Sequence, residues 1–239
     1  MKQKRSVEAI WYDSNYYNKT EKAVPQWYRM LYPRIKGIVN NNSKILEVGC
    51  GKSYVLKKLA KEKLVDPKKI YGIEQSDVAI HYMKKYIRGG NFVSADANIL
   101  PYKNNVFDFV LLLEVIEHLE KPNKVLSEIS RVVKKRGTLF LSFPNFSFFP
   151  WRIARFFSDV FKLPQLINKQ PIDAIYTINE VIEMVESVGF GCKSITGVTY
   201  LTAGLSSIES IREYALTKAF NRLGGSRFSL HPLFEFVKL

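Results

Sequence analysis

Short apolar runs alternate with amphipathic stretches along most of this 239-residue chain. Four of the apolar runs lie at residues 44–48, 69–74, 91–97 and 106–113. The last of these is almost continuously apolar, which is typical of a strand buried on both faces of a parallel sheet. Apolar positions at helical spacing are found at 54–63, 77–87 and 121–134. This alternation predicts an α/β fold with a mostly parallel sheet.

The remaining segments extend the pattern. Three further strands are predicted at 137–143, 191–201 and 234–238. Further helices are predicted at 177–188 and 206–222, and cap helices within residues 1–40. Glu180 stands at the capping-box position of the helix at 177–188, and Gly189 follows its end. The sequence leaves the pairing of the last strand open. A chain of this length can hold one large domain with a sizeable core.

The first strand runs into the most specific motif of the chain. Glu47 ends the strand, glycines follow at positions 49 and 51, and Ser53 is a plausible N-cap for a helix that begins at Tyr54. Glycine lets a ligand lie directly on the backbone. The loop therefore suits a nucleotide-like ligand that carries a positive charge. Tyr54 stands where a dinucleotide-binding loop needs a small residue, which argues against a dehydrogenase.

Four predicted strands each deliver a carboxylate at or just after their ends. These are Glu47, Glu74, Asp96 and Glu114. The carboxyl ends of parallel strands share one edge of the sheet, where open α/β folds bind their ligands. Glu74 comes 23 residues after Gly51, a place from which a carboxylate can accept hydrogen bonds from both hydroxyls of a ribose.

These motifs resemble those of the class I S-adenosylmethionine-dependent methyltransferases. Residues 47–53 are similar to the first motif of that class, Glu-x-Gly-x-Gly-x-Gly, with Ser53 at the last glycine. Within the class, residues 114–119, 142–145 and 176–177 most resemble ubiquinone-biosynthesis O-methyltransferases and relatives associated with methionine biosynthesis. The Asn/Asp-Pro-Pro-Tyr/Phe stretch of amino-group methyltransferases does not follow the fourth strand. The specific similarity covers 44–145 and extends more loosely to about residue 200.

The resemblance implies a Rossmann-like fold of seven strands with helices on both faces. It divides one domain into four parts. These are an N-terminal helical cap (1–40), a cofactor-binding core (44–145), a substrate lid after strand 5 (146–176) and a C-terminal part (177–239). It also implies that the protein transfers a methyl group from S-adenosylmethionine to an oxygen atom of a small-molecule or lipid-like acceptor. S-adenosylhomocysteine is then the second product.

The resemblance also implies roles for single residues. The methionine end of the cofactor would lie on Gly49, Cys50 and Gly51, with Glu47 near its ammonium group. The ribose would be held by Glu74 and Gln75, and the adenine by Asp96 and Ala97. Glu114 would complete the cofactor site. A simple turn cap is the alternative role for Asp96.

His118 and Glu117 are the candidates for acid–base catalysis. An unperturbed imidazole pKa of about 6.5 suits the removal of a proton from a hydroxyl acceptor near neutral pH. The alternative for His118 is a structural histidine at a helix start, bonded to the backbone.

A metal site is a further interpretation of the same stretch. Glu114, Glu117 and His118 would share one face of a helix, and a similar Glu-x-x-Glu-His helps to bind Mg²⁺ in small-RNA 2′-O-methyltransferases and some quinone O-methyltransferases. The RNA enzymes add a histidine after the fifth strand. The only histidine of this chain beyond 118 is His231.

Two features concern partners. Aromatic residues alternate with cations between Phe146 and Tyr176. This segment could be a lid over an apolar or anionic acceptor, a stacking surface for RNA, or a helix that rests on a membrane surface. The simplest alternative is an apolar face packed on the sheet. The net charge is 36 − 22 = +14, which favours anionic partners, although a lysine-rich proteome would explain it equally. An RNA 2′-O-methyltransferase and a non-catalytic cofactor-binding module are the alternative functions.

No targeting signal is evident. The longest apolar runs fall short of the ~18–20 residues that span a bilayer, and the basic N-terminus leads into no apolar signal-peptide core. The two cysteines, Cys50 and Cys192, form no disulfide framework or metal knuckle. We expect a cytoplasmic protein.

Overall fold

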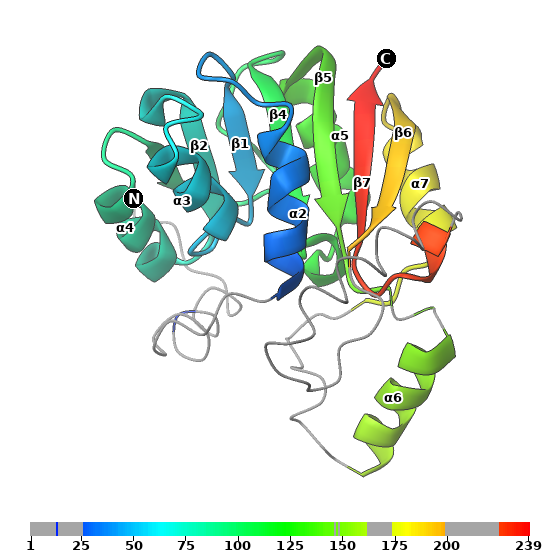
Figure 1. The fold of residues 1–239 in the computed structure, drawn as a ribbon. Helices are drawn as coiled ribbons and strands as arrows, with labels where there is room; N and C mark the ends of the chain where they lie inside the picture. Colours follow the sequence, from blue (N-terminus) through cyan, green and yellow to red (C-terminus); the bar gives the residue numbers. More distant parts are fainter. Residues whose placement is uncertain (1–12, 14–25, 146, 148, 162–173, 199–224) are drawn as a thin grey trace.

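A seven-stranded sheet forms the centre of the computed structural model (Figure 1). The structure describes residues 13, 26–145, 147, 149–161, 174–198 and 225–239. The strands are β1 (Ile45–Val48), β2 (Ile70–Glu74), β3 (Asn91–Ser94), β4 (Phe107–Leu113), β5 (Val133–Ser142), β6 (Phe190–Gly197) and β7 (Pro232–Lys238). Their order across the sheet is β3-β2-β1-β4-β5-β7-β6. β7 alone runs antiparallel to its neighbours, so the predicted mostly parallel sheet is confirmed.

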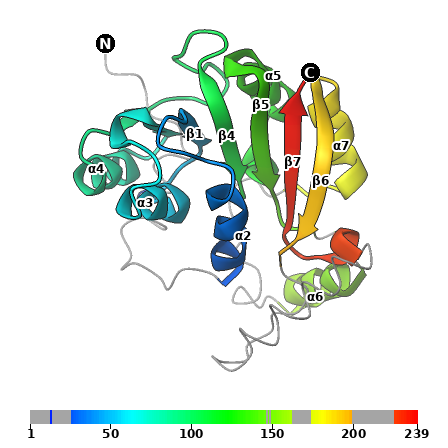
Figure 2. The ribbon, with the colours of Figure 1, turned by 45° about the horizontal axis from the view of Figure 1, so that its top comes forward.

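Helices cover both faces of the sheet (Figures 1 and 2). One face carries α2 (Gln26–Lys36), α3 (Tyr54–Lys61) and α4 (Asp77–Tyr86), and the other carries α5 (Pro122–Val132) and α7 (Ile178–Glu186). Short 3-10 turns lie at Pro67–Lys69, Ile116–His118 and Gly225–Phe228. Helix α6 (Phe149–Val160) stands away from the sheet, beyond the carboxyl ends of the parallel strands.

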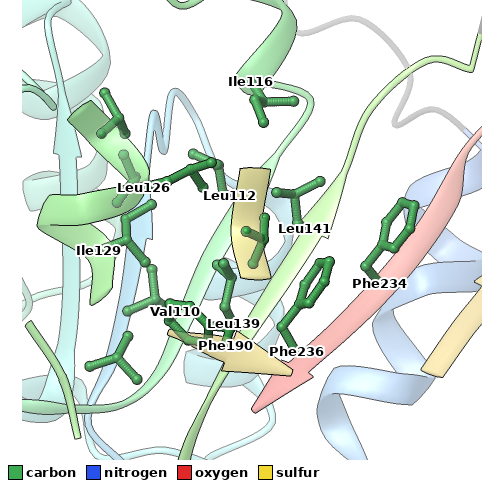
Figure 3. Close-up of a cluster of buried hydrophobic side chains, with 14 of the residues drawn as sticks. Val110, Leu112, Ile116, Leu126, Ile129, Leu139, Leu141, Phe190, Phe234 and Phe236 are labelled. Carbon is green, nitrogen blue, oxygen red and sulfur yellow. The ribbon is translucent and has the colours of Figure 1, made fainter. Parts of the chain in front are cut away.

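The core consists of two apolar layers, one on each face of the sheet. Strand β4 serves both, because successive side chains of a strand point to opposite faces. Val110 and Leu112 pack under α5 and α7 (Figure 3), whereas Leu111 and Leu113 pack under α2 and α3. This two-sided burial explains the continuous apolar run that the sequence shows at this strand.

The C-terminal strand differs most from its prediction. The sequence left the pairing of β7 open, and the structure inserts it between β5 and β6 with Leu141 opposite Phe234. The rings of Phe234 and Phe236 stack 5.6 Å apart and lie in the core (Figure 3). A strand that looked marginal is therefore an interior strand of the sheet.

Element boundaries shift by a few residues. β5 begins at Val133 rather than at 137, and α5 ends accordingly at Val132. The capping box of Thr177 and Glu180 at the start of α7 is confirmed. The predicted helix at 206–222, residues 199–201 of the predicted sixth strand, and most of the predicted cap at 1–40 lie outside the described residues. Among the helices that the structure describes, none has the length and apolar character needed to cross a membrane.

Candidate active site

The loop after β1 turns sharply at two positions that favour glycine. Gly49 has a φ of +70° and Gly51 a φ of +46°, a region that favours glycine. A Cβ at Gly49 would also lie 2.6 Å from Cγ2 of Val115. Both glycines therefore have a steric reason, and the half-buried Gly49 brings its main chain to the carboxyl edge of the sheet without a side chain.

Glu47 is a buried carboxyl at the base of this loop. Only 2% of the residue is exposed. The pKa of Glu47 is raised to about 8, chiefly by burial; a hydrogen bond from Ser53 lowers it, and the nearby charge of Glu74 raises it. The Ser53 hydroxyl donates to the Glu47 carboxylate and accepts from the backbone N–H of Leu56 at 3.0 Å. The serine at the last glycine position of the motif is thus the N-cap of α3, as predicted, and also orients Glu47.

Glu74 connects the first two loops of the site. Its Oε2 accepts from the N–H of Gly51 at 3.1 Å, and its Oε1 accepts from the N–H groups of Gln75 at 2.8 Å and Ser76 at 3.1 Å. The glycine loop and the loop after β2 are therefore fixed to the same carboxylate. Asp13 reaches this place from the N-terminal segment, where its side chain accepts from the Ser76 hydroxyl.

Cys50 packs inside the protein. Its thiol lies against Gly72, where an added Cβ would be 2.8 Å from Sγ and 2.7 Å from the ring of Phe92. Burial raises the pKa of the thiol well above its usual range. The Cys50 side chain consequently serves packing between β1 and β2, and a ligand in the loop would meet this residue through its main chain.

Asp96 caps a turn after β3. The residue is exposed, and its Oδ1 accepts from both the backbone N–H and the side-chain amide of Asn98, each at 2.8 Å. This is the alternative role that the sequence left open. Ala97 is half-buried and packs against the larger core layer. The adenine-binding role of these two residues stays a prediction.

Glu114 ends β4 in a left-handed backbone conformation, with a φ of +55°. Its carboxylate is held from two sides. The Ser142 hydroxyl donates to Oε1 at 2.7 Å, and Nδ1 of His231 lies 3.1 Å from Oε2. The backbone N–H of Glu114 also donates to the Ser142 carbonyl at 3.0 Å. The ends of β4, β5 and the segment before β7 therefore meet at this carboxylate.

Glu117 and His118 form a second pair in the 3-10 turn that follows. Nε2 of His118 lies 3.5 Å from Oε1 of Glu117, whose residue is only 2% exposed. The N–H of Ala174 donates to the Glu117 carbonyl at 2.8 Å, so the chain that leaves the site after β5 returns to it here. The half-buried Tyr176 is close enough that burial, and then the charge of Glu117, raise its pKa.

The alternative interpretation of this stretch as a metal site gains no support from the structure. Glu114, Glu117 and His118 were expected on one helical face, but Glu114 precedes the 3-10 turn and faces Ser142 and His231. In the part of the chain that the structure describes, no three histidine, cysteine, aspartate or glutamate residues are arranged to hold a metal ion. The spacing argument for this alternative assumed a regular helix, whereas the structure has a 3-10 turn that begins after Glu114.

The sequence also pointed to His231 only as a remote metal ligand. β7 runs antiparallel to β5, so its first residues lie at the same edge as the ends of β4 and β5. Topology alone brings His231 to Glu114, 117 positions away in the chain. No spacing in the sequence could have found this pair.

The comparisons with known proteins agree with this architecture. Residues 46–141 match the protein family described as "Methyltransferase domain". A ubiquinone biosynthesis O-methyltransferase of Coxiella burnetii is 27% identical over 163 residues, which are 65% of this chain and 67% of the relative. An uncharacterised protein of Methanocaldococcus jannaschii is 30% identical over 104 residues, which are 43% of this chain and 47% of that protein.

Two solved structures show the same fold. A chain in the complex between the Haloferax volcanii Trm112 methyltransferase activator and a methyltransferase has a TM-score of 0.67 and 16% identity, over 99% of both chains. A SAM-dependent methyltransferase of Thermotoga maritima has a TM-score of 0.60 and 17% identity, over 89% of this chain and 91% of that one.

The strand order and the glycine loop thus define a Rossmann-like, class I methyltransferase fold. Residues 46–141 match a methyltransferase domain, and this match together with the fold supports an enzyme of the S-adenosylmethionine-dependent methyltransferase class.

Proposed function

We propose that this enzyme methylates an oxygen atom of a small-molecule or lipid-like acceptor. The observation that carries the proposal is the grouping of imidazoles with carboxylates after β4, where His118 lies beside Glu117 and His231 beside Glu114. A hydroxyl group loses its proton when its oxygen is methylated, and imidazole is suited to accept that proton near neutral pH. The ubiquinone-biosynthesis relative is named as an O-methyltransferase, which supports the same acceptor atom.

The residues around the first two loops fit the cofactor. The Gly49 position has no room for a Cβ, and Glu47 offers a buried carboxyl at the base of the same loop. A cationic ammonium group would favour the ionised form of that carboxyl. Glu74 accepts three backbone hydrogen bonds in all, and a carboxylate has about four acceptor sites, which leaves capacity for a ribose hydroxyl. Bound S-adenosylmethionine would supply an electrophilic methyl group.

The main task of the protein is then to align the acceptor with that methyl group. Positioning of two reactants can lower a barrier by on the order of 7–11 kcal/mol when the geometry is right. In open α/β sheets, ligands bind where the strand order reverses, and here that place lies between β1 and β4. We place the cofactor on the β1–β3 side and the acceptor beyond the ends of β4 and β5.

Helix α6 supports a lipid-like acceptor. Large apolar side chains on and just after this helix are 40–71% exposed, namely Phe149, Ile153, Phe156, Phe157, Val160 and Phe161. The sequence left open that this face packs on the sheet, and the structure shows that these side chains do not. An apolar surface of this kind marks an interaction site. We propose that α6 covers the hydrocarbon part of the acceptor or rests on a membrane surface.

Substitution of the α6 surface tests this part of the proposal. The double variant Phe156→Ser with Phe157→Ser should leave the free energy of unfolding within about 0.5 kcal/mol of the wild type, because both side chains are exposed. Methyl transfer to acceptors with a long alkyl tail should fall, whereas transfer to tail-free analogues should not. Equal activity of the double variant on both kinds of acceptor would argue against the lipid-binding role.

Methyl transfer into a fractionated extract of the source cells tests the acceptor class. Radiolabelled S-adenosylmethionine would be incubated with the enzyme and extract, and the RNA, protein, organic-soluble and small polar fractions then counted. We expect label in the organic or small polar fraction. Analysis of the labelled product should show that the methyl group is bonded to oxygen rather than to nitrogen. Label confined to protein, or to nitrogen, would overturn the proposal.

RNA is the second candidate acceptor. The net charge of +14 favours an anionic partner. On the surface of α3 and α4, the Nζ atoms of Lys52 and Lys57 lie 5.1 Å and 5.0 Å from the centroid of the Tyr82 ring, which combines cations with an aromatic face. Label in the RNA fraction of the same experiment would select this function.

A protein partner follows from one structural comparison. The Haloferax volcanii methyltransferase chain was solved in complex with the Trm112 activator. We propose that this chain also forms a complex with a small activator protein. Co-expression with Trm112-like proteins of the same source and gel filtration would test this, and elution of both proteins as separate species would contradict it.

A further inference from the structure

His231 lies on the side of the sheet to which we assign the acceptor, and the proposed function names no single histidine as the base. We propose that His231, oriented by Glu114, is the group that takes the proton from the acceptor hydroxyl. This inference rests on the proposed oxygen methylation. It assigns the general base to a residue that reaches the site only through the antiparallel pairing of β7.

The contacts of Glu114 orient the imidazole. Ser142, which is 1% exposed, donates to one carboxylate oxygen at 2.7 Å, and Nδ1 of His231 lies 3.1 Å from the other. The side chains of His231 and Glu114 are only 14% and 16% exposed. Water therefore competes little with the pair, and a charge-assisted hydrogen bond is strong in such a setting.

The contact with Glu114 also selects a tautomer. An ionised carboxylate accepts hydrogen bonds and donates none, so the neutral His231 ring carries its proton on Nδ1. Nε2 then holds the lone pair and is the basic nitrogen. This arrangement, in which a carboxylate orients one ring nitrogen so that the other serves as base, is the recurring design of histidine general bases.

The backbone around the pair is fixed from several directions. Glu114 adopts a φ of +55°, an uncommon and strained conformation for a residue with a side chain. The N–H of Val198 donates to the His231 carbonyl at 3.0 Å, and that of Asn145 donates to the Leu230 carbonyl at 2.7 Å.

The position in the sheet suits a base for the acceptor rather than a cofactor ligand. His231 precedes β7, which is separated from β1 by β5 and β4. It therefore lies on the side of the strand-order reversal that we assign to the acceptor, and its side chain extends over the end of β5 to reach Glu114.

The proton step balances as follows. The acceptor O–H bond breaks, its proton moves to Nε2 of His231, and an oxygen lone pair forms the new bond to the methyl carbon. The bond between that carbon and sulfur breaks, and its electron pair stays on sulfur. Glu114 stabilises the imidazolium, which afterwards loses its proton to water.

His118 is the competing base. Its Nε2 faces Oε1 of Glu117 at 3.5 Å, so the two histidines present different nitrogens to their carboxylates. His81, the remaining histidine of the chain, is exposed on α4 and provides a matched control.

Kinetics with acceptors of graded acidity tests the assignment. The probes are catechols whose hydroxyl pKa is lowered stepwise by nitro substitution. His231→Ala should lower kcat about 10²–10⁴-fold with catechol but much less with an acceptor already ionised at the assay pH, because an ionised oxygen needs no base.

Controls separate this role from a loss of cofactor binding. Calorimetry should find that His231→Ala binds S-adenosylmethionine within about twofold of wild type, and His81→Gln should behave as wild type. Glu114→Gln should lower kcat, with partial recovery in Glu114→Asp.

An activity-independent readout completes the test. Nitrogen-15 NMR of the imidazoles should show neutral His231 protonated on Nδ1 in the wild type, and a shift of that tautomer in Glu114→Gln. Protonation on Nε2 would overturn the inference. So would equal losses of His231→Ala with all catechols, or an acidity-dependent loss in His118→Ala alone. If the wild type methylated no hydroxyl at all, in catechols or in cell extract, the proposed function would fail and this inference with it.

Discussion

Glu47 illustrates how burial sets chemistry at the scale of one residue. Its carboxyl is 2% exposed and has a pKa near 8, so it is mainly protonated at neutral pH in the ligand-free protein. An approaching cation reverses this balance, because opposite charge favours the ionised form. The buried carboxyl is therefore costly to ionise until a positively charged ligand arrives.

The stability of the protein should record this shift. A carboxyl whose pKa rises on folding from 4.5 to about 8 makes the folded state the stronger proton binder between these values. Its contribution is complete below pH 4.5 and is lost as the pH rises towards 8. The slope from this one group is at most about 1.4 kcal/mol per pH unit.

Urea unfolding at a series of pH values, compared between wild type and Glu47→Gln, would isolate that contribution. We expect the difference in unfolding free energy between the two proteins to change steadily from pH 5 to pH 8. Parallel curves for the two proteins would show that Glu47 is not buried in its neutral form.

Glu74 gives a second prediction at this scale. Glu74→Ala removes the acceptor of three backbone N–H groups and of the proposed ribose contact. Binding of S-adenosylmethionine should weaken by about 1.5–3 kcal/mol, the range for hydrogen bonds to charged groups. Calorimetric titration measures this. Glu183→Ala on the exposed side of α7 is the control, and equal affinities for both variants would remove the ribose assignment.

At the scale of elements, the junctions between strands and helices carry the site. The loop from β1 to α3 depends on two positive φ angles and on the cap from Ser53, and the end of β4 depends on Glu114. Each junction places a carboxylate and main-chain groups at one edge of the sheet. The helices themselves contribute mainly the apolar faces that hold those junctions in place.

Gly49→Ala tests the first junction. The new Cβ would overlap Cγ2 of Val115 at 2.6 Å. The alanine would also have to adopt a φ of +70°, which is strained for a residue with a side chain. We expect a loss of about 1–3 kcal/mol in unfolding free energy. Val115→Ala in the same protein should restore part of that loss, because it removes the overlapping methyl groups. Gly189→Ala serves as the control, since its φ is +93° but its added Cβ meets nothing within 4 Å. Equal losses in the two single variants would show that the contact with Val115 is unimportant.

At the scale of the whole molecule, the last strand, β7, joins β6 to the rest of the sheet. β7 pairs with β5 and β6, and the ring of Phe234 stacks on Phe143 at 5.8 Å. The same strand brings His231 to Glu114. The stability of the sheet and the position of His231 beside Glu114 therefore both depend on this last strand.

Phe234→Ala should consequently destabilise the protein by about 3–5 kcal/mol, as expected for a fully buried aromatic side chain. Thermal and denaturant unfolding would measure the loss. Leu239→Ala, at a residue that is 76% exposed, should stay within about 0.5 kcal/mol of the wild type. A small loss at Phe234 would mean that β7 is not an interior strand in solution.

The sequence by itself determined the fold class and the presence of carboxylates at the ends of neighbouring parallel strands. Alternating apolar periodicities predicted the strands and crossover helices, because these periods follow from backbone geometry alone. The acids at the strand ends and the glycine loop were found for the same reason, since the motif is local. Even Ser53, a departure from the glycine pattern, was identified as the helix cap that the structure shows.

Only the tertiary structure decided what depends on distant contacts. It inserted β7 between β5 and β6, packed the Cys50 thiol against Gly72, and placed Glu114 beside His231 and Glu117 beside His118 as two separate pairs. It also left large apolar side chains of α6 exposed. Local patterns carry no information on which strand a C-terminal segment will join. The meeting of His231 with Glu114 follows from that choice of neighbour, which the packing of the whole sheet decides.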